Sequence, residues 1–318
     1  MKLYAPQGGA LAPLPPDAPA GDALWIDLFR PLPEQIAALA ALGIEVPTLE
    51  DMEEIEISNR LYREGAASYM TAVLPGLTPE GDHVSGPVTF ILMPERLVTV
   101  RHHTPRPFET FPARACKSST GCGSADRLFL GLIEDIIARL ADLLEHAGRV
   151  IDTTSTAIFS ARDVGRAQLL QEALESVGRQ AELMARVRLG LLTLERVLGF
   201  YTVGLENHHE QKPLRGQLKE MLRDVQALEV HLDFLSGRVG LAVDTTLGLI
   251  NLEQNNTVRI LSVVAALFLP PTLIASVYGM NFAHMPELGW RLGYPMALGL
   301  MVGSAVVTYA FIKWKKWI

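Results

Sequence analysis

The chain has 318 residues, 49% of them hydrophobic and 20% charged, with a mean hydropathy of +0.21. This composition excludes a disordered chain and argues against a purely soluble enzyme. The net charge of −7 is uneven, because residues 1–254 carry 23 basic and 34 acidic side chains, whereas the remainder is basic and apolar. An acidic body argues against nucleic acid as a partner, since phosphate binding needs clustered lysine and arginine, and it is compatible with cations as ligands or cargo.

Residues 1–120 are predicted to form an α/β domain. Short runs of β-type residues alternate there with proline and glycine, which punctuate strands and turns. The expected elements are strands over 23–28, 68–74, 88–93 and 97–102, and a helix over 33–42.

The two cysteines, Cys116 and Cys122, end this region. Five residues separate them, which is wider than the usual zinc-knuckle or redox CxxC spacing. The sequence therefore predicts ordinary reduced thiols near a loop.

Residues 121–254 are predicted to form a stalk of long helices. No proline occurs between Pro112 and Pro213, and residues 126–147 and 165–205 carry apolar side chains at intervals of three to four residues. This spacing predicts two long antiparallel helices, with the turn between them near residues 152–163.

A third long helix is expected to begin after Pro213, because no further proline appears until Pro270. Nine apolar residues step along it by alternating four and three positions, which is a heptad seam that would pack on neighbouring helices. They are Leu214, Leu218, Met221, Val225, Leu228, Leu232, Leu235, Val239 and Ala242. Residues 214–278 as one helix would extend about 100 Å, which joins the stalk to the first apolar run as a single rod.

The C-terminal region, residues 255–318, is predicted to be a transmembrane domain. Residues 260–283 and 292–312 contain no charged side chain, and both runs exceed the ~20 residues that a helix needs to cross a bilayer. The expected spans are about 258–279 and 292–312. The segment between the spans carries one basic residue, Arg291, whereas the C-terminal tail carries three, Lys313, Lys315 and Lys316. The positive-inside rule then places both termini in the cytoplasm of a multi-pass protein of the inner (cell) membrane.

A motif lies at the outer end of the first predicted span. It reads Tyr278-Gly279-Met280-Asn281-Phe282 and is followed by Met285-Pro286-Glu287-Leu288. Here the sequence resembles the CorA family of divalent-cation (magnesium/cobalt) channels, whose signature is Gly-Met-Asn at this position. The resemblance in architecture covers the whole chain, and sequence-level recognition covers residues from about 255 onward.

The resemblance implies a fold and a function. The fold would be an α+β cytoplasmic domain followed by long helices and two C-terminal transmembrane helices, assembled as a funnel-shaped homopentamer in the lipid bilayer. The first span of each copy would line a central pore. The cargo would be Mg²⁺, with Co²⁺ or Ni²⁺ as accidental passengers, moving inward passively, and cytoplasmic Mg²⁺ as regulatory ligand would close the channel.

One face of the first span has the chemistry that such a pore requires. Its residues recur about every three and a half positions and are Asn255, Val258, Leu261, Ala265, Leu269, Thr272 and Ser276. Mg²⁺ sheds water reluctantly, so a neutral pore whose oxygens contact the hydrated ion fits it better than a carboxylate cage. Leu261 and Leu269 would form hydrophobic rings that close the pore by dewetting.

The motif residues receive separate predicted roles. Asn281 is the expected selector at the pore entrance, and Gly279 would let the chain leave the helix. Met280 is expected to pack, because a thioether is a poor ligand for a hard cation. Five copies of Glu287 would raise the local cation concentration at the mouth.

Two features stay open at the level of sequence. Pro270 and Pro271 remove backbone donors, and this either bends the helix or adds oxygens that face the pore. The regulatory Mg²⁺ site has no short motif, and Glu220 and Asp224 are only weak candidates for it.

Two other functions are compatible with the same architecture. The first is a ZntB-like Zn²⁺ transporter, but residues 255–283 contain no cysteine or histidine for Zn²⁺ and the nearest imidazole is His284. The second is a membrane-anchored cation sensor whose spans only tether the acidic domain. No phosphate loop, nucleophile elbow or metalloprotease motif occurs, so the sequence predicts neither an enzyme nor an organic cofactor.

Overall fold

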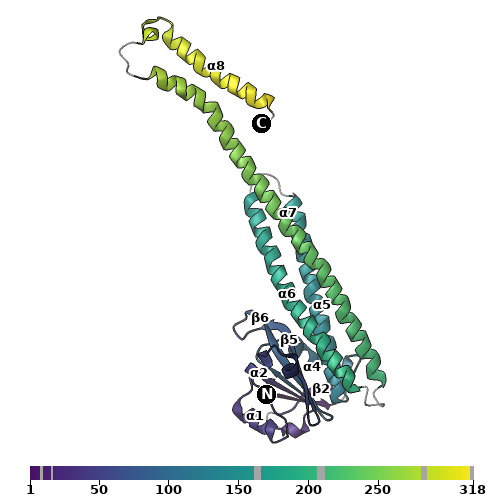
Figure 1. Cartoon of the computed structure of the whole chain (residues 1–318). Coiled ribbons are helices and arrows are strands. Elements are labelled where there is room, and N and C mark those ends of the chain that lie inside the picture. The colour runs from purple at the N-terminus through teal and green to yellow at the C-terminus, as the bar shows by residue number, and fades with distance from the viewer. Residues whose placement is uncertain (8–9, 16, 161–165, 206–211, 281–284, 316–318) are drawn as a thin grey trace. The chain divides into compact units, whose positions relative to one another are not determined.

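The computed structural model describes every residue except 8–9, 16, 161–165, 206–211, 281–284 and 316–318 (Figure 1). The strands are β1 (Lys2–Gln7), β2 (Ala10–Pro13), β3 (Trp25–Phe29), β4 (Leu61–Glu64), β5 (Ala67–Leu77), β6 (His83–Leu92) and β7 (Leu97–Arg101). The α-helices are α1 (Pro33–Ala40), α2 (Leu49–Glu53), α3 (Ile57–Arg60), α4 (Pro107–Arg114), α5 (Ala125–Ser160), α6 (Arg166–Leu205), α7 (Lys212–Tyr278) and α8 (Gly293–Trp314). Short 3-10 helices are η1 (Ala20–Asp22), η2 (Ala115–Lys117) and η4 (Pro286–Gly289). By contacts the chain divides into two compact units, residues 1–160 with 173–243 and residues 161–172 with 244–318.

A seven-stranded sheet organises the first unit. Its order is β2-β1-β3-β7-β6-β5-β4, and all neighbours are antiparallel except β3 and β7, which run parallel. The predicted strands and the first predicted helix are confirmed as β3, β5, β6, β7 and α1. The short strands β1, β2 and β4 were not predicted, because they lie at or near the edges of the sheet and carry little of its apolar pattern.

Both faces of the sheet are covered, so side chains that alternate along each strand enter two different cores. On β6, for example, Phe90 belongs to the core shared with α4, α5, α6 and α7, and Ile91 belongs to the core beneath α1 and α2. Both side chains are fully buried. The sheet is therefore the middle layer of three.

Three long helices, α5, α6 and α7, pack against the sheet in the core that contains Phe90, and they extend beyond it. Figure 1 shows the three side by side. The helix α5 runs to Ser160, so residues 152–160 are helical and the predicted turn near 152–163 began too early along the chain. The third helix is confirmed as the uninterrupted α7 of 67 residues. Eight of its nine predicted heptad residues are buried or partly buried in the core that α7 shares with α5 and α6, and the ninth, Ala242, is also buried, which confirms that the seam packs on neighbouring helices.

A buried ion pair joins the two parallel strands of the sheet. Arg101 on β7 donates two hydrogen bonds to Asp27 on β3, at 3.0 Å from Nε to Oδ1 and 2.9 Å from Nη2 to Oδ2. The exposed fractions of these side chains are only 5% and 1%. Thr99 donates to the same carboxylate at 2.9 Å and accepts from the Trp25 indole at 3.0 Å. The charges are thus satisfied inside the core, as burial requires.

His103 fills a slot formed by the backbone of β5 and β6. Its Nε2 lies 2.9 Å from the carbonyl oxygen of Leu74. A Cβ added at Gly76 or at Gly86 would stand 2.6 Å from the imidazole ring, so both positions need glycine. Burial lowers the pKa of His103 to about 4, against an opposing effect of the Leu74 hydrogen bond. The ring is therefore neutral in the folded chain at neutral pH.

Acidification is expected to destabilise the first unit through His103. Between the usual histidine pKa of about 6.5 and the folded value of about 4, His103 is protonated in the unfolded chain but neutral in the folded chain. The free energy of unfolding has its full value above the usual pKa of about 6.5. It decreases as the pH falls through this window, by at most about 3 kcal/mol. Thermal unfolding of the wild type and of His103→Gln at pH 7, 5.5 and 4.5 tests this expectation. Identical pH dependence in the two proteins would exclude it.

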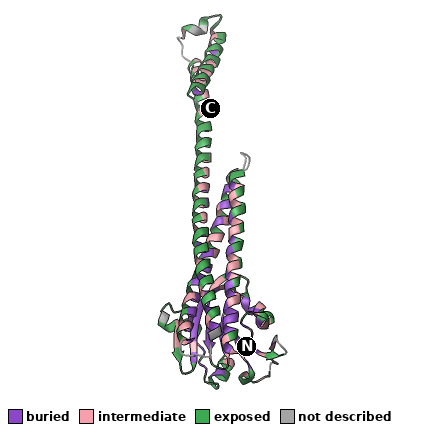
Figure 2. Ribbon diagram, turned by 90° about the vertical axis from the view of Figure 1, so that its right-hand side faces the viewer, coloured by how far each residue is buried: buried purple, intermediate pink, exposed green. Residues whose placement is uncertain are grey.

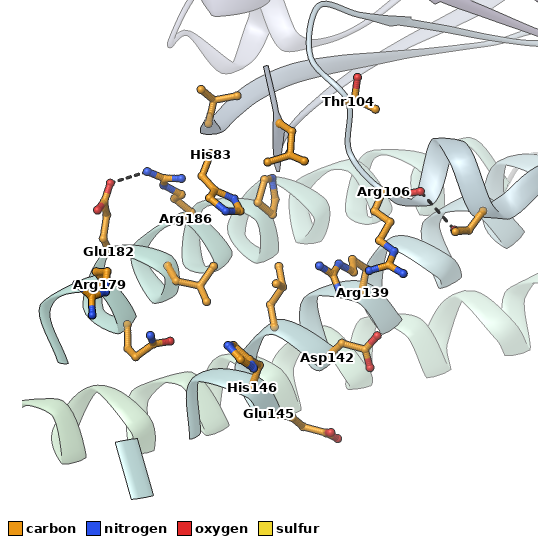
Figure 3. Close-up of a pocket in the computed structure, with 18 of the residues that line it drawn as sticks. His83, Thr104, Arg106, Arg139, Asp142, Glu145, His146, Arg179, Glu182 and Arg186 are labelled. Atoms are coloured by element: carbon orange, nitrogen blue, oxygen red, sulfur yellow. Dashed lines mark hydrogen bonds and ion pairs between the residues drawn. The ribbon is translucent and has the colours of Figure 1, made fainter. Parts of the chain in front are cut away.

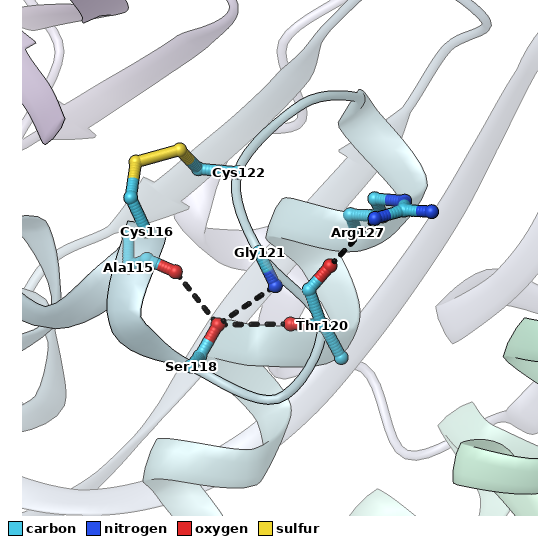
Figure 4. The surroundings of a disulfide bond; sticks show 7 residues. All are labelled: Ala115, Cys116, Ser118, Thr120, Gly121, Cys122 and Arg127. Atoms are coloured by element: carbon cyan, nitrogen blue, oxygen red, sulfur yellow. Dashed lines mark hydrogen bonds between the residues drawn. A yellow bond between two sulfur atoms is a disulfide. The ribbon is translucent and has the colours of Figure 1, made fainter. Parts of the chain in front are cut away.

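The cysteine pair differs from the sequence prediction, because Cys116 and Cys122 form a disulfide (Figure 4). A tight loop brings their Cα atoms to 4.8 Å. The hydroxyl of Ser118 donates to the carbonyl of Ala115 at 2.6 Å and accepts from the backbone N–H of Gly121, whose φ is +72°. The prediction of reduced thiols was wrong because a sequence separation of six residues does not fix a Cα distance, whereas this loop does.

Candidate functional site

Two helices are long and apolar enough to cross a membrane. In α7 the stretch Leu214–Tyr278 has an 18-residue window of mean hydropathy 2.2, and α8 has a window of 1.8. None of the first window and 11% of the second is buried within the structure, whereas the core helix of a soluble protein would be mostly buried. The two C-terminal apolar helices expected from the sequence are therefore present, and the bounds of the spans within them stay a prediction.

The predicted pore-lining residues all lie on the C-terminal part of α7. Each of the seven is exposed, and the exposed fractions of Val258, Leu261 and Leu269 are 60%, 64% and 65%. Figure 2 shows this part of α7 as mainly exposed. The described residues of this chain therefore leave the predicted face uncovered.

A second face of the same helix is less exposed. Its half-buried residues are Val263, Leu267, Pro270, Pro271, Ile274 and Tyr278. Several of them precede a pore-lining candidate by two positions, a rotation of about 200° on an α-helix. The helix α8 lies beside this part of α7 in Figures 1 and 2. We therefore assign the half-buried face to contact with α8, which leaves the candidate face on the opposite side.

The helix α7 continues through its two internal prolines, Pro270 and Pro271. Just beyond them, the hydroxyl of Thr272 donates to the carbonyl oxygen of Leu269 at 3.0 Å. This bond turns the hydroxyl proton toward the helix and leaves the Thr272 oxygen as an acceptor on the exposed face. Such an oxygen can accept a hydrogen bond from the water shell of a cation.

The motif begins where α7 ends. The backbone N–H of Gly279 donates to the carbonyl oxygen of Ala275 at 2.9 Å, and a Cβ at this position would lie 3.0 Å from that oxygen. Met280 is 46% exposed. Asn281 lies outside the described residues, and Glu287 belongs to η4. The structure thus places Gly279 and Met280 directly after the candidate face, and the role of Asn281 stays a prediction.

The candidate regulatory acids Glu220 and Asp224 are one helical turn apart on α7, and both are exposed. Another acid, Glu229, has its pKa raised above the usual value by burial and by neighbouring Glu195. Among the residues that the structure describes, no three histidine, cysteine or acidic side chains are grouped so that they could hold a metal ion.

Aromatic side chains at the start of α8 were missed by the sequence analysis. Trp290 and Tyr294 are 60% and 77% exposed, and Trp314 at the other end of the helix is 76% exposed. Tryptophan and tyrosine concentrate where a membrane meets water. Their positions at the two ends of a charge-free run were the signal that could have identified them.

Comparison with known proteins adds to this geometry. A family model described as "CorA-like Mg2+ transporter protein" matches residues 20–314. The magnesium transport protein CorA of Pasteurella multocida (strain Pm70) is 33% identical over 303 residues, which cover 95% of this chain and 94% of that protein. The complete structure of the CorA magnesium transporter from Methanocaldococcus jannaschii matches with a TM-score of 0.74 at 18% identity, over 100% of this chain and 98% of that chain.

A weaker likeness extends to the ZntB cytoplasmic domain from Vibrio parahaemolyticus RIMD 2210633. That match has a TM-score of 0.54 at 11% identity, and it covers 80% of this chain and 98% of the other. At this identity it shows a shared fold alone.

Proposed function

Because the chain belongs to the CorA-like Mg²⁺ transporter family, whose model matches residues 20–314, we propose that it is a channel for passive Mg²⁺ influx. Transport is the activity that the family description names, and near full-length similarity to a magnesium transport protein supports it. Co²⁺ and Ni²⁺ would pass as accidental cargo. No enzyme activity and no organic cofactor belong to this proposal.

The single observation that carries the proposal is the uncovered face of α7 beside the Gly279-Met280 turn. Its seven side chains are exposed, as are most of their neighbours on α7, whereas six residues assigned to the side of α8 are half-buried. In a homopentamer, five copies of this face would surround one axis and stack its residues into rings. Amides and hydroxyls would stand at both ends of that path, with aliphatic side chains between them.

Ion entry is proposed to depend on the motif. Five copies of Asn281 would hold the waters of a hydrated Mg²⁺ at the mouth, since Mg²⁺ prefers oxygen ligands and releases water slowly. Five copies of Glu287 would attract the cation from outside. Gly279 would keep the turn after α7 narrow, and Met280 would pack rather than coordinate.

Passage along the pore is proposed to be passive and gated. The membrane potential supplies about 4.6 kcal/mol for two charges at 100 mV. Rings of Leu261 and Leu269 would interrupt the water column when the pore is narrow. Cytoplasmic Mg²⁺ bound by carboxylates of neighbouring copies, with Glu220 and Asp224 as candidates, would favour the closed form because it binds that form more tightly.

The proposed placement is the inner (cell) membrane with both termini in the cytoplasm. The lysine-rich tail that follows α8 supports it, because positive residues stay on the cytoplasmic side. The division into residues 1–120, 121–254 and 255–318 would then separate an α/β domain, a helical stalk and the transmembrane domain.

Purified protein in liposomes is expected to admit Mg²⁺ when the interior is negative. Cobalt hexaammine, which mimics hydrated Mg²⁺ but does not exchange its ligands, is expected to block from the side of the motif. Flux should also fall as Mg²⁺ is raised on the other side. A fluorescent Mg²⁺ indicator inside the liposomes measures all three effects.

The alternatives give different results in the same liposomes. A membrane-anchored sensor would pass no ion. Zn²⁺ uptake that exceeds Mg²⁺ uptake, requires a proton gradient and ignores the hexaammine would favour a ZntB-like transporter. Loss of that Zn²⁺ uptake in His284→Ala would identify its ligand.

A further inference from the structure

The first unit contains a large pocket, none of whose lining residues belongs to the candidate ion path. It has a volume of about 1130 Å³ and is lined by the ends of β5 and β6, the segment before α4, and the helices α5 and α6 (Figure 3). Pockets that hold organic ligands usually have volumes of about 300–1,000 Å³. The pocket is therefore large enough for an organic molecule.

The charged lining of this pocket has a slight excess of arginine over acidic residues, although residues 1–254 are acidic as a whole. Five arginines reach it, and they are Arg106, Arg139, Arg149, Arg179 and Arg186. Two of these already have acidic partners, because Arg186 binds Glu182 at 2.5 Å and Arg149 binds Glu145 at 3.6 Å. Within the part of the chain that the structure describes, the other three have no ion pair.

Two of the unpaired arginines lie on the same side of the pocket. In the view of Figure 3, Arg106 and Arg139 lie on one side, whereas Arg179 and Arg186 lie on the other side. Arg106 is exposed and Arg139 is half-buried, so water moderates the repulsion between their charges, and an anion bound between them would turn it into attraction. Their planar donor forks match phosphate oxygens in particular.

Glu109 and Asp142 also line the pocket, and neither has an ion pair among the described residues. Together with the three unpaired arginines they leave a small positive excess. An anion with one charge would gain little from this balance. An anion with several phosphate charges can engage both Arg106 and Arg139 and overcome the repulsion from the acids.

The rest of the lining suits an organic group attached to the phosphates. Leu143 and Leu183 are half-buried and face the pocket from α5 and α6, and they offer an apolar surface to a ring. The side-chain oxygen of Gln180 is buried and has no hydrogen-bond partner among the described residues. Such an oxygen would accept a hydrogen bond from a ligand hydroxyl or amino group, as a sugar or a base provides.

We propose that this pocket is a binding site for a nucleoside polyphosphate. Arg106 and Arg139 hold the phosphates, the leucine surface receives the base, and Gln180 accepts a hydrogen bond from the nucleoside. The site is made of residues of the first unit and shares none with the proposed ion path, so its occupancy is an additional property of the protein.

Calorimetric titration of the purified full-length protein with ATP, without divalent cations, tests the site directly. ATP is expected to bind, and Arg106→Ala and Arg139→Ala are each expected to weaken binding by about tenfold or more. Arg139→Lys should weaken it less, because lysine keeps the charge but loses the fork. Arg223→Ala on the exposed surface of α7 removes the same charge outside the pocket and should leave binding unchanged.

Tripolyphosphate in place of ATP separates the phosphate contacts from the nucleoside contacts. We expect it to bind more weakly than ATP, and Gln180→Leu to reduce that difference. Equal affinities would overturn the nucleoside contact. Absence of ATP binding, or undiminished binding in Arg106→Ala and Arg139→Ala proteins with wild-type thermal midpoints, would overturn the site. Since ion flux is not the readout, either result is independent of the proposed transport.

Discussion

Asn281→Ala is expected to reduce Mg²⁺ uptake into liposomes by about tenfold or more, while the assembled protein remains intact. The substitution removes one amide from each copy, so a pentamer would lose five polar contacts to the hydrated ion at once. Asn281 follows α7 in the sequence, and the described residues of the two cores of the first unit all precede residue 240. Assembly is checked by size-exclusion chromatography with light scattering, and uptake by the fluorescent indicator.

Asn256→Ala is the matched control for this substitution. Asn256 is an exposed asparagine on α7, about 100° around the helix from Asn255, and its side-chain oxygen accepts a hydrogen bond from Arg259 at 2.6 Å. Its loss should leave most of the uptake in place. Block by cobalt hexaammine should weaken in Asn281→Ala and persist in Asn256→Ala. Wild-type uptake by a correctly assembled Asn281→Ala protein would refute the selector role.

Asp27→Ala is expected to produce the largest loss of stability in the first unit. The substitution leaves the Arg101 guanidinium buried without its carboxylate, which costs about 3–5 kcal/mol. For a unit of this size such a loss corresponds to a decrease of roughly 6–20 °C in the thermal midpoint. Differential scanning fluorimetry of the purified full-length protein measures it.

Two further variants separate charge burial from simple loss of contacts. Arg114→Ala removes an ion pair of 3.0 Å with Asp135, but the Arg114 side chain is 68% exposed, so this loss should be at most about 1 kcal/mol. The double variant Asp27→Leu/Arg101→Met removes both buried charges and should recover part of the stability. An Asp27→Ala midpoint equal to that of Arg114→Ala would show that the buried pair has no special importance.

Much of the fold could be predicted because apolar periodicity is strong where packing is extensive. Nine apolar residues at heptad spacing in α7 predict a buried helix face. The inner strands β5, β6 and β7 contain runs of apolar residues that predict buried strands. The end of α5 was predicted too early, because residues 152–160 are polar and carry little pattern. The disulfide depended on a loop conformation set by Ser118 and Gly121, which residue spacing alone does not determine.

The candidate ion path could be proposed from sequence because its period of about three and a half residues and its motif adjoin each other. All seven face residues are exposed, as are most of their neighbours on α7, and their role in a pore stays a prediction. The arginine pocket could not be predicted in the same way. Arg106 and Arg139 are 33 positions apart and belong to different elements, so only the packing of α5 against the sheet brings them together. Carboxylates of a regulatory Mg²⁺ site would likewise come from distant parts of the chain or from different copies, so residue spacing does not identify them.

The single parallel pairing in the sheet has a consequence for synthesis of the chain. The ion pair of Asp27 cannot form until Arg101, which is 74 residues farther along the chain, has been synthesised. At about 5–20 residues per second, a ribosome needs roughly 4–15 s to supply it. During that interval β3 has only β1 beside it, and its other edge can pair with other chains. The protein is therefore most prone to aggregation before residue 101 has emerged, and a chaperone that covers β3 would act in that interval.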